Sequence, residues 1–229
     1  SCSSGWFPTQ AARSSGEAEL GSFKALGAPV ALIKLILRLW PDDDLEPGAM
    51  LSGTYRSKLR DFTVISATDG NHGKSLAAAS HSAGCGCVIV LHANVSAERE
   101  AAIAAYGADI VRIKGNYDES VEEAARLARE NGWHGVSDTS YDGYEEIPRD
   151  VMQVYGTIAA EIVLSKRPVT HLILQGGVGG LAAGIVSYLW EIYGSRRPTV
   201  VIVEPEQADC LFQSAIEGIP AKATGSVDS

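Results

Sequence analysis

The sequence predicts an α/β protein in which helices cover both faces of parallel β-sheets, arranged in three layers. Between residues 63 and 217, short apolar runs rich in β-branched residues alternate with longer amphipathic or Ala-rich segments. Strands that alternate with helices of this length form βαβ units on a parallel sheet. The composition agrees, because 45% hydrophobic and 21% charged residues are typical of a globular protein with a sizeable core.

The N-terminal part does not follow this alternation. Residues 1–21 are rich in Ser, Gly and Ala without periodicity, which predicts a poorly ordered lead-in. A helix with a wide apolar side is predicted over residues 23–40, where Gly27 and Pro29 indicate a separate or irregular first turn. The acidic, Pro-bounded segment 41–48 ends that helix and is expected to be a solvated loop.

From residue 63 onward, predicted strands and helices follow one another in regular order. The predicted strands span residues 63–67, 87–92, 109–113, 135–137, 171–175 and 199–204. The predicted helices span residues 74–83, 97–106, 120–131, 149–166, 181–193 and 208–217. In an open parallel sheet, ligands bind at the carboxyl ends of the strands, so the turns that follow residues 67 and 175 are the candidate site.

Charge, hydropathy and cysteine usage exclude several classes of function. The net charge of −9 and the pI near 5.0 argue against nucleic acid as a partner, because binding to phosphates needs a clustered basic face. The longest apolar stretch, residues 25–40, is short and is interrupted by Lys34 and Arg38, so no membrane span is expected. The four cysteines are irregularly spaced, which indicates reduced thiols of a cytoplasmic protein and no zinc site.

The first candidate turn lies in the segment TVISATDGNHGKS, residues 63–75, where a strand, a tight turn and a helix N-terminus meet. Unpaired N–H groups at the positive end of a helix can receive an anion or a polar ligand. A Walker A loop is the nearest generic motif, but Thr68 stands where its first glycine should be. The alternative is a turn without a ligand, since Asp, Asn and His also favour turns through local hydrogen bonds.

The second candidate turn holds four glycines in five residues, from Gly176 to Gly180, directly before a helix. So much glycine costs conformational entropy that a simple connection need not lose, and its backbone N–H groups suit a phosphate. The same turn fits G-x-G-x-x-A, and Glu204 follows Gly177 by 27 residues, somewhat far for a ribose-binding acid. A dinucleotide site therefore remains an alternative at this point.

Five segments in order resemble the diaminopropionate ammonia-lyases, pyridoxal-phosphate-dependent enzymes of fold type II, the tryptophan-synthase-β-like fold. They are GSFKALGAPVAL at residues 21–32, SATDGNHGKSLAAA at 66–79, SDTSYDGYEEIPRDVMQVYGTIAAE at 137–161, GGVGGLAAG at 176–184 and VEPEQADCLFQSA at 203–215. The YDGYEEIP block is the most specific to this family, because the other blocks have looser counterparts in threonine and serine dehydratases. The resemblance implies a larger domain from residues 1–55 and 154–229 and a smaller domain from residues 56–153.

The resemblance also implies a set of cofactor-binding residues. Lys24 is expected to bind pyridoxal 5'-phosphate covalently, which is chemically reasonable because a lysine in an apolar setting can lose its proton and attack an aldehyde carbon. Without the resemblance, Lys24 reads as a lysine on a helix surface. Asn71 is expected to contact the ring oxygen of the cofactor. Gly176, Gly177, Val178, Gly179 and Gly180 are expected to hold its phosphate.

Asp69 and Asp138 match the two acidic residues that, in the family, remove the α-proton from opposite faces of the substrate. The implied reaction is the α,β-elimination of ammonia from either enantiomer of 2,3-diaminopropionate, giving pyruvate and ammonia, with the cofactor as electron sink. Without the resemblance, each aspartate reads as a turn or cap residue after a strand. His72 is expected to pack or to orient its neighbours.

The chain is shorter than members of this family, and the resemblance implies that the larger domain is truncated at both ends, including the group that faces the pyridine nitrogen. Two alternative functions and one expectation about assembly follow. A threonine- or serine-dehydratase-like deaminase is the alternative enzyme, and a truncated, inactive paralogue is the alternative without catalysis. A homodimer is expected from the family alone.

Overall fold

The computed structural model describes residues 22–68, 70–141, 143–221, 223 and 225. The chain forms two compact units, of which the first ends at Val151 and the second begins at Met152. The predicted lead-in over residues 1–21 lies outside the described residues. The assignment of residues 1–55 and 154–229 to one larger domain stays a prediction, because it concerns how the two units combine.

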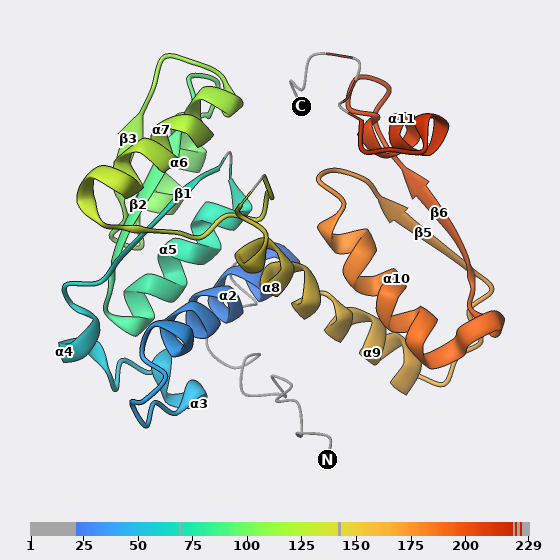
Figure 1. The fold of residues 1–229 in the computed structure, drawn as a ribbon, viewed down its shortest axis with the longest axis horizontal. Helices are drawn as coiled ribbons and strands as arrows, with labels where there is room; N and C mark the ends of the chain where they lie inside the picture. Colours follow the sequence, from blue (N-terminus) through green and yellow to red (C-terminus); the bar gives the residue numbers. More distant parts are fainter. Residues whose placement is uncertain (1–21, 69, 142, 222, 224, 226–229) are drawn as a thin grey trace. The chain divides into compact units, whose positions relative to one another are not determined.

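The first unit contains a four-stranded sheet in the order β3-β2-β1-β4, with all neighbours parallel (Figure 1). Its strands are β1 (Thr63–Ala67), β2 (Gly86–Leu91), β3 (Asp109–Arg112) and β4 (His134–Gly135). The bounds of β1 are those predicted from the apolar run, and the other strands lie within one or two residues of prediction. The parallel sheet predicted from the alternation of strands and helices is therefore confirmed.

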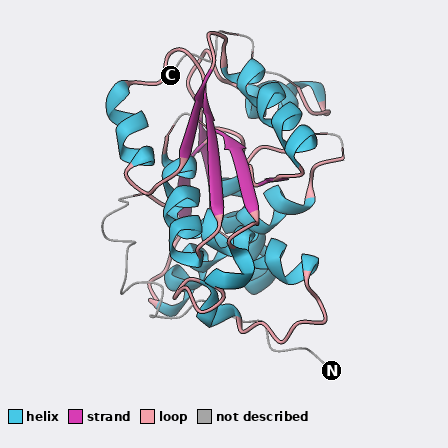
Figure 2. Cartoon of the chain, turned by 90° about the vertical axis from the view of Figure 1, so that its left-hand side faces the viewer, coloured by secondary structure: helices cyan, strands magenta, loops and turns pink. Residues whose placement is uncertain are grey.

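Helices cover both faces of this sheet (Figure 2). Ile65 and Val88 belong to the face that packs against α7 (Tyr117–Asn131). The opposite face carries α5 (Asn71–Ala83), where Gly73 lies close to Ile89, and α6 (Ala97–Ala104) packs beside α5. Side chains alternate between the two faces of a strand, so each apolar run supplies both interfaces. The first unit thus has the predicted three layers.

Helix α2 (Lys24–Leu39) packs on α5 and runs without interruption through Pro29, so the first turn, predicted to be separate or irregular, is continuous with the rest of the helix. Proline removes one backbone hydrogen bond and crowds the preceding turn. The helix nevertheless continues because its buried side is dense: Ala25, Ala28 and Ala31 are each at most 5% exposed. Burial of this apolar side offsets the lost hydrogen bond.

Two short helices, α3 (Pro47–Met50) and α4 (Arg56–Leu59), follow α2. The predicted acidic loop therefore ends in a helical turn. Glu46 caps α3, since its Oε1 accepts a hydrogen bond from the Gly48 N–H at 3.2 Å. A carboxylate before a helix and a proline in its first turn are both favourable. None of the helices in the described ranges is long and apolar enough to cross a bilayer.

The second unit contains a parallel pair of strands, β5 (His171–Gln175) and β6 (Thr199–Val203). Leu172 and Leu174 pack against helices α9 (Gly156–Leu164) and α10 (Gly180–Tyr193), which cover one face of the pair. A 3₁₀ turn, η1 (Gly194–Arg196), leads into β6, and α11 (Cys210–Glu217) follows it. This βαβ unit places the glycine turn between β5 and α10.

The single helix predicted over residues 149–166 is wrong, because the structure has two helices, α8 (Glu146–Val154) and α9, that meet at Tyr155. The Tyr155 N–H bonds the Met152 carbonyl at 3.1 Å, a contact three residues back that tightens the turn. Another helix passes close to this point: a Cβ on Gly184 of α10 would lie 2.3 Å from the Met152 carbonyl oxygen.

We expect Gly184→Ala to destabilise the protein by about 1–3 kcal/mol, because the added methyl group overlaps a backbone atom that cannot rotate away. Gly180→Ala is the matched control in the same helix, since its Cβ would meet its nearest neighbour at 4.0 Å. Urea denaturation of both variants measures the difference. Equal stability of the two variants would contradict this account of the close approach.

Candidate active site

The turn between β1 and α5 is held by Thr68. Its Oγ1 accepts hydrogen bonds from the N–H groups of Gly70, at 3.2 Å, and Gly73, at 3.3 Å. A Cβ on Gly73 would lie 2.2 Å from the Thr68 methyl group, so this close packing requires glycine. Thr68 therefore holds N–H groups at the start of α5, whose N-cap position is Gly70, and the residue that breaks the Walker A pattern has a structural function of its own. Sequence reasoning missed this function.

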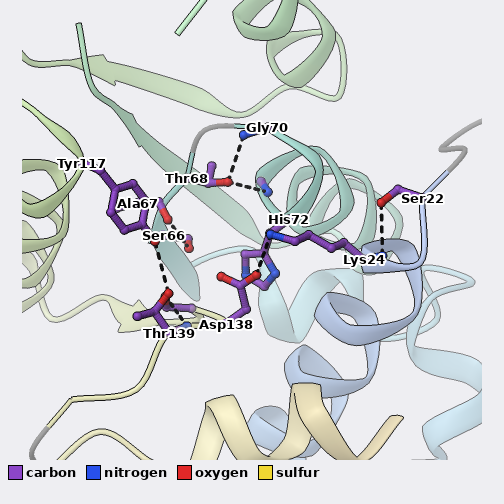
Figure 3. Close-up of polar contacts among 12 residues, drawn as sticks. Ser22, Lys24, Ser66, Ala67, Thr68, Gly70, His72, Tyr117, Asp138 and Thr139 are labelled. Atoms are coloured by element: carbon purple, nitrogen blue, oxygen red, sulfur yellow. Dashed lines mark hydrogen bonds and ion pairs between the residues drawn. The ribbon is translucent and has the colours of Figure 1, made fainter. Parts of the chain in front are cut away.

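Lys24 and Asp138 lie together, although they are far apart in the sequence. The Lys24 Nζ lies 3.0 Å from the Asp138 Oδ2, and the side chains are 29% and 11% exposed. Lys24 is the first residue of α2, and Asp138 follows β4 at the carboxyl end of the sheet. Figure 3 shows the lysine chain extended toward the carboxylate above the ring of His72. A partly shielded amine and a partly shielded carboxylate thus lie in contact with each other.

The surroundings of Asp138 lower its pKa. Burial raises this pKa, but the electrostatic interactions with His72 and Lys24 and the hydrogen bond from Lys24 together outweigh burial. Asp138 is therefore ionised at neutral pH and able to accept a proton.

His72 is buried at 1% exposure on the first turn of α5. Its Nε2–H donates to the Val136 carbonyl at 2.9 Å, which connects α5 to the segment that carries Asp138. Its Nδ1 is buried and has no hydrogen-bond partner in the described part of the chain. His72 is thus packed inside the fold, and its expected role of orienting its neighbours stays a prediction. Asn71, beside it, is exposed at the first position of α5.

The glycine turn of the second unit lies between β5 and α10, and its first N–H, that of Gly176, donates to the Val203 carbonyl at 2.7 Å. Gly179 has a φ of +84° and precedes α10, whose first N–H groups have no acceptors within the helix. A Cβ on Gly177 would meet no atom within 4 Å, and Val178 is 62% exposed. The turn is therefore open at Gly177 and Val178, and N–H groups exposed there suit a phosphate.

Glu204 is engaged in a way that counts against the dinucleotide alternative. Its Oε1 accepts from the Leu211 N–H at 3.0 Å, and its Oε2 accepts from the Phe212 N–H at 2.9 Å. Both carboxylate oxygens thus hold the start of α11. A ribose-binding acid would need those oxygens for the ligand.

The structure brings together Lys24, Asp138 and His72 in the first unit, and it places residues Gly176–Gly180 in the second. Asp69 lies outside the described residues. The roles of all these residues toward a ligand stay predictions. Within the described residues, no cluster of three or more potential ligands could hold a metal ion.

Residues 16–228 match the family model of the pyridoxal-phosphate dependent enzymes. The chain belongs to this family. The family confirms the cofactor predicted from the sequence. The residues present fit that group, because Lys24 offers an amine beside a carboxylate and the glycine turn offers an open N–H cradle.

Relatives within the family are diaminopropionate ammonia-lyases. The protein of Salmonella typhimurium is 37% identical over 217 residues, which cover 91% of this chain and 54% of that protein. The holo structure from Escherichia coli is 33% identical with a TM-score of 0.81, covering 90% of this chain and 53% of that one. A chloroplastic threonine dehydratase of Arabidopsis thaliana is more distant, at 28% identity over 86% of this chain and 28% of that protein.

These likenesses confirm the predicted resemblance and the fold class. The chain spans about half the length of the diaminopropionate ammonia-lyases that it matches.

Proposed function

We propose that the chain acts as a pyridoxal-phosphate-dependent lyase that eliminates ammonia from 2,3-diaminopropionate. The observation that supports this function best is the Lys24–Asp138 pair, 3.0 Å apart at the carboxyl edge of the sheet. Both residues belong to segments that resemble the diaminopropionate ammonia-lyases, and the relatives with 37% and 33% identity carry that name. An enzyme of this class needs an amine to hold the cofactor and a base beside it.

Three groups of residues would hold the cofactor. The Lys24 amine, after losing its proton, would attack its aldehyde carbon, and Asn71 would contact its ring oxygen. The turn Gly176–Gly180 would hold its phosphate through the N–H groups that follow Gly176, whose own N–H is bonded to the Val203 carbonyl. Once bound, the cofactor withdraws electrons from the substrate Cα. We assign no further residue to its binding.

Asp138 would act as the base. Its carboxylate is ionised because its pKa is lowered, and it lies beside the Lys24 amine. A substrate amine that takes the place of the lysine amine comes within reach of the same carboxylate, which can then remove the proton from Cα. On the family resemblance, Asp69 would do the same from the opposite face, so that both enantiomers react.

The stoichiometry of the products tests this function. The chain with pyridoxal phosphate is expected to release pyruvate and two molecules of ammonia from each 2,3-diaminopropionate, because both amino groups leave. A dehydratase acting on serine would release one ammonia per pyruvate, and one acting on threonine would release another keto acid. Turnover of serine or threonine in preference to diaminopropionate would overturn the proposal. Cofactor binding without turnover of any of them would favour an inactive paralogue.

A cytoplasmic homodimer that does not bind nucleic acid is also proposed, on the family resemblance and the acidic composition alone. Sedimentation of the chain as a monomer would contradict the dimer.

A further inference from the structure

We propose that Tyr144 is a positioning residue that keeps the Asp138 carboxylate directed at the Lys24 amine, with Tyr117 supporting the same segment from the other side. This inference rests on the proposed function. It assigns a physical role to the YDGYEEIP block, which the sequence marks as distinctive and which provides none of the residues proposed to contact the cofactor or the substrate.

The first contact lies directly before Asp138. The Tyr144 hydroxyl oxygen accepts a hydrogen bond of 2.7 Å from the Ser137 N–H. Burial, above all, raises the pKa of Tyr144, so the hydroxyl stays protonated and neutral at working pH. The backbone immediately before Asp138 is thus held by the Tyr144 hydroxyl, which stays neutral when the Asp138 carboxyl gains or loses a proton.

The ring of Tyr144 is itself held firmly. It stacks on Tyr141 with ring centroids 4.9 Å apart and planes 15° apart, and the backbones of the two residues exchange hydrogen bonds of 3.3 and 2.8 Å. The ring also lies against Gly135 at the end of β4, where a Cβ would be 3.6 Å from Tyr144 Cε2. The hydroxyl therefore has one defined position relative to the sheet.

The second contact lies directly after Asp138. The Thr139 N–H donates to the Ser137 Oγ at 3.2 Å, and the Thr139 Oγ1 lies 3.2 Å from the Tyr117 hydroxyl at the start of α7. Figure 3 shows Tyr117 and Thr139 reaching each other beside Asp138. The peptide that carries the base is consequently held on both sides, by residues of two different elements.

Such support matters because Asp138 lies in a connection after a strand of only two residues, where the backbone ladder ends. A base misplaced by about 1 Å can lower the rate about 10²-fold. The two tyrosines supply the rigidity that the short strand lacks, and they keep the Nζ–Oδ2 distance at 3.0 Å.

The test compares Tyr144→Phe with Tyr141→Phe in the full chain. Tyr144→Phe removes the hydroxyl and keeps the stacked ring, whereas Tyr141→Phe removes a hydroxyl from the more exposed partner of the same stack. In the protein without cofactor, we expect hydrogen exchange at the Ser137 amide to become about tenfold faster in Tyr144→Phe only. An exchange rate equal to that of Tyr141→Phe would overturn the inference.

Turnover provides the second readout. With cofactor bound, Tyr144→Phe is expected to lower kcat about 10-fold to 100-fold, with little change in KM, for the enantiomer that depends on Asp138 and not for the other. An equal loss for both enantiomers would indicate a general structural defect and overturn the inference. If Asp138→Asn affects neither enantiomer, the proposed role of Asp138 fails, and the exchange measurement still decides whether Tyr144 fixes this segment.

Discussion

Replacing Lys24 by alanine is expected to abolish covalent binding of pyridoxal phosphate and, with it, all turnover of 2,3-diaminopropionate. The reason is the position of the Lys24 amine beside Asp138, the base proposed for the reaction. Among the described residues, no other lysine nitrogen forms an ion pair with Asp138. The yellow colour that the chain acquires with the cofactor should disappear in the variant. Borohydride reduction of the unmodified chain, followed by peptide mapping, should locate the cofactor on Lys24.

Two further variants separate chemistry from stability. Lys24→Arg keeps a positive charge facing Asp138 but lacks the nucleophilic amine, so it should remain as stable as the original chain and still fail to bind the cofactor covalently. Lys114→Ala removes an exposed lysine and should behave like the original chain. A cofactor trapped on Lys114, or colour retained in Lys24→Ala, would contradict the assignment.

The sequence predicted those parts of the fold that depend on local patterns. Strands β1 and β5 have the predicted bounds, because each is a short apolar run that ends at turn-forming residues. The break between α8 and α9 was missed; it lies where Gly184 of another helix approaches the Met152 carbonyl, a tertiary contact that no local pattern records. The prediction at Pro29 failed for a similar reason. Burial of the apolar side of α2 offsets the backbone hydrogen bond that the proline removes, and the sequence pattern does not show that burial.

The candidate site was predicted less from patterns than from the resemblance. Neither the position of Lys24 on a helix nor that of Asp138 after a strand indicates that the two side chains meet, since contacts between distant residues arise only from the fold. A pattern did point to the carboxyl ends of β1 and β5, where the two turns lie, each in its own sheet. Thr68 and Tyr144 were missed because their hydroxyl groups bond backbone N–H groups, contacts that many residues of the same type never make.

Asp138→Asn is expected to lower kcat about 10²-fold to 10⁴-fold for one enantiomer of 2,3-diaminopropionate, the usual contribution of a general base. Asparagine has nearly the same shape and can still accept a hydrogen bond from Lys24, but it cannot take up a proton. The other enantiomer should react almost as before, because its proton would go to Asp69 on the resemblance to the family. Rate measurements with each pure enantiomer test this expectation.

The control is Asp61→Asn. The Asp61 side chain is 93% exposed, so this substitution should change the rate for neither enantiomer.

The pH dependence of the rate has a definite sign. The pKa of Asp138 is lowered by His72 and Lys24 against the opposing effect of burial, so the base of the original chain stays ionised from neutral pH down to at least its ordinary pKa of 3.8. A contrary result would be a rate that falls as the pH drops below neutral in the original chain but not in Asp138→Asn. Such a fall would mean that the pKa of the Asp138 carboxyl is raised, which contradicts this electrostatic account.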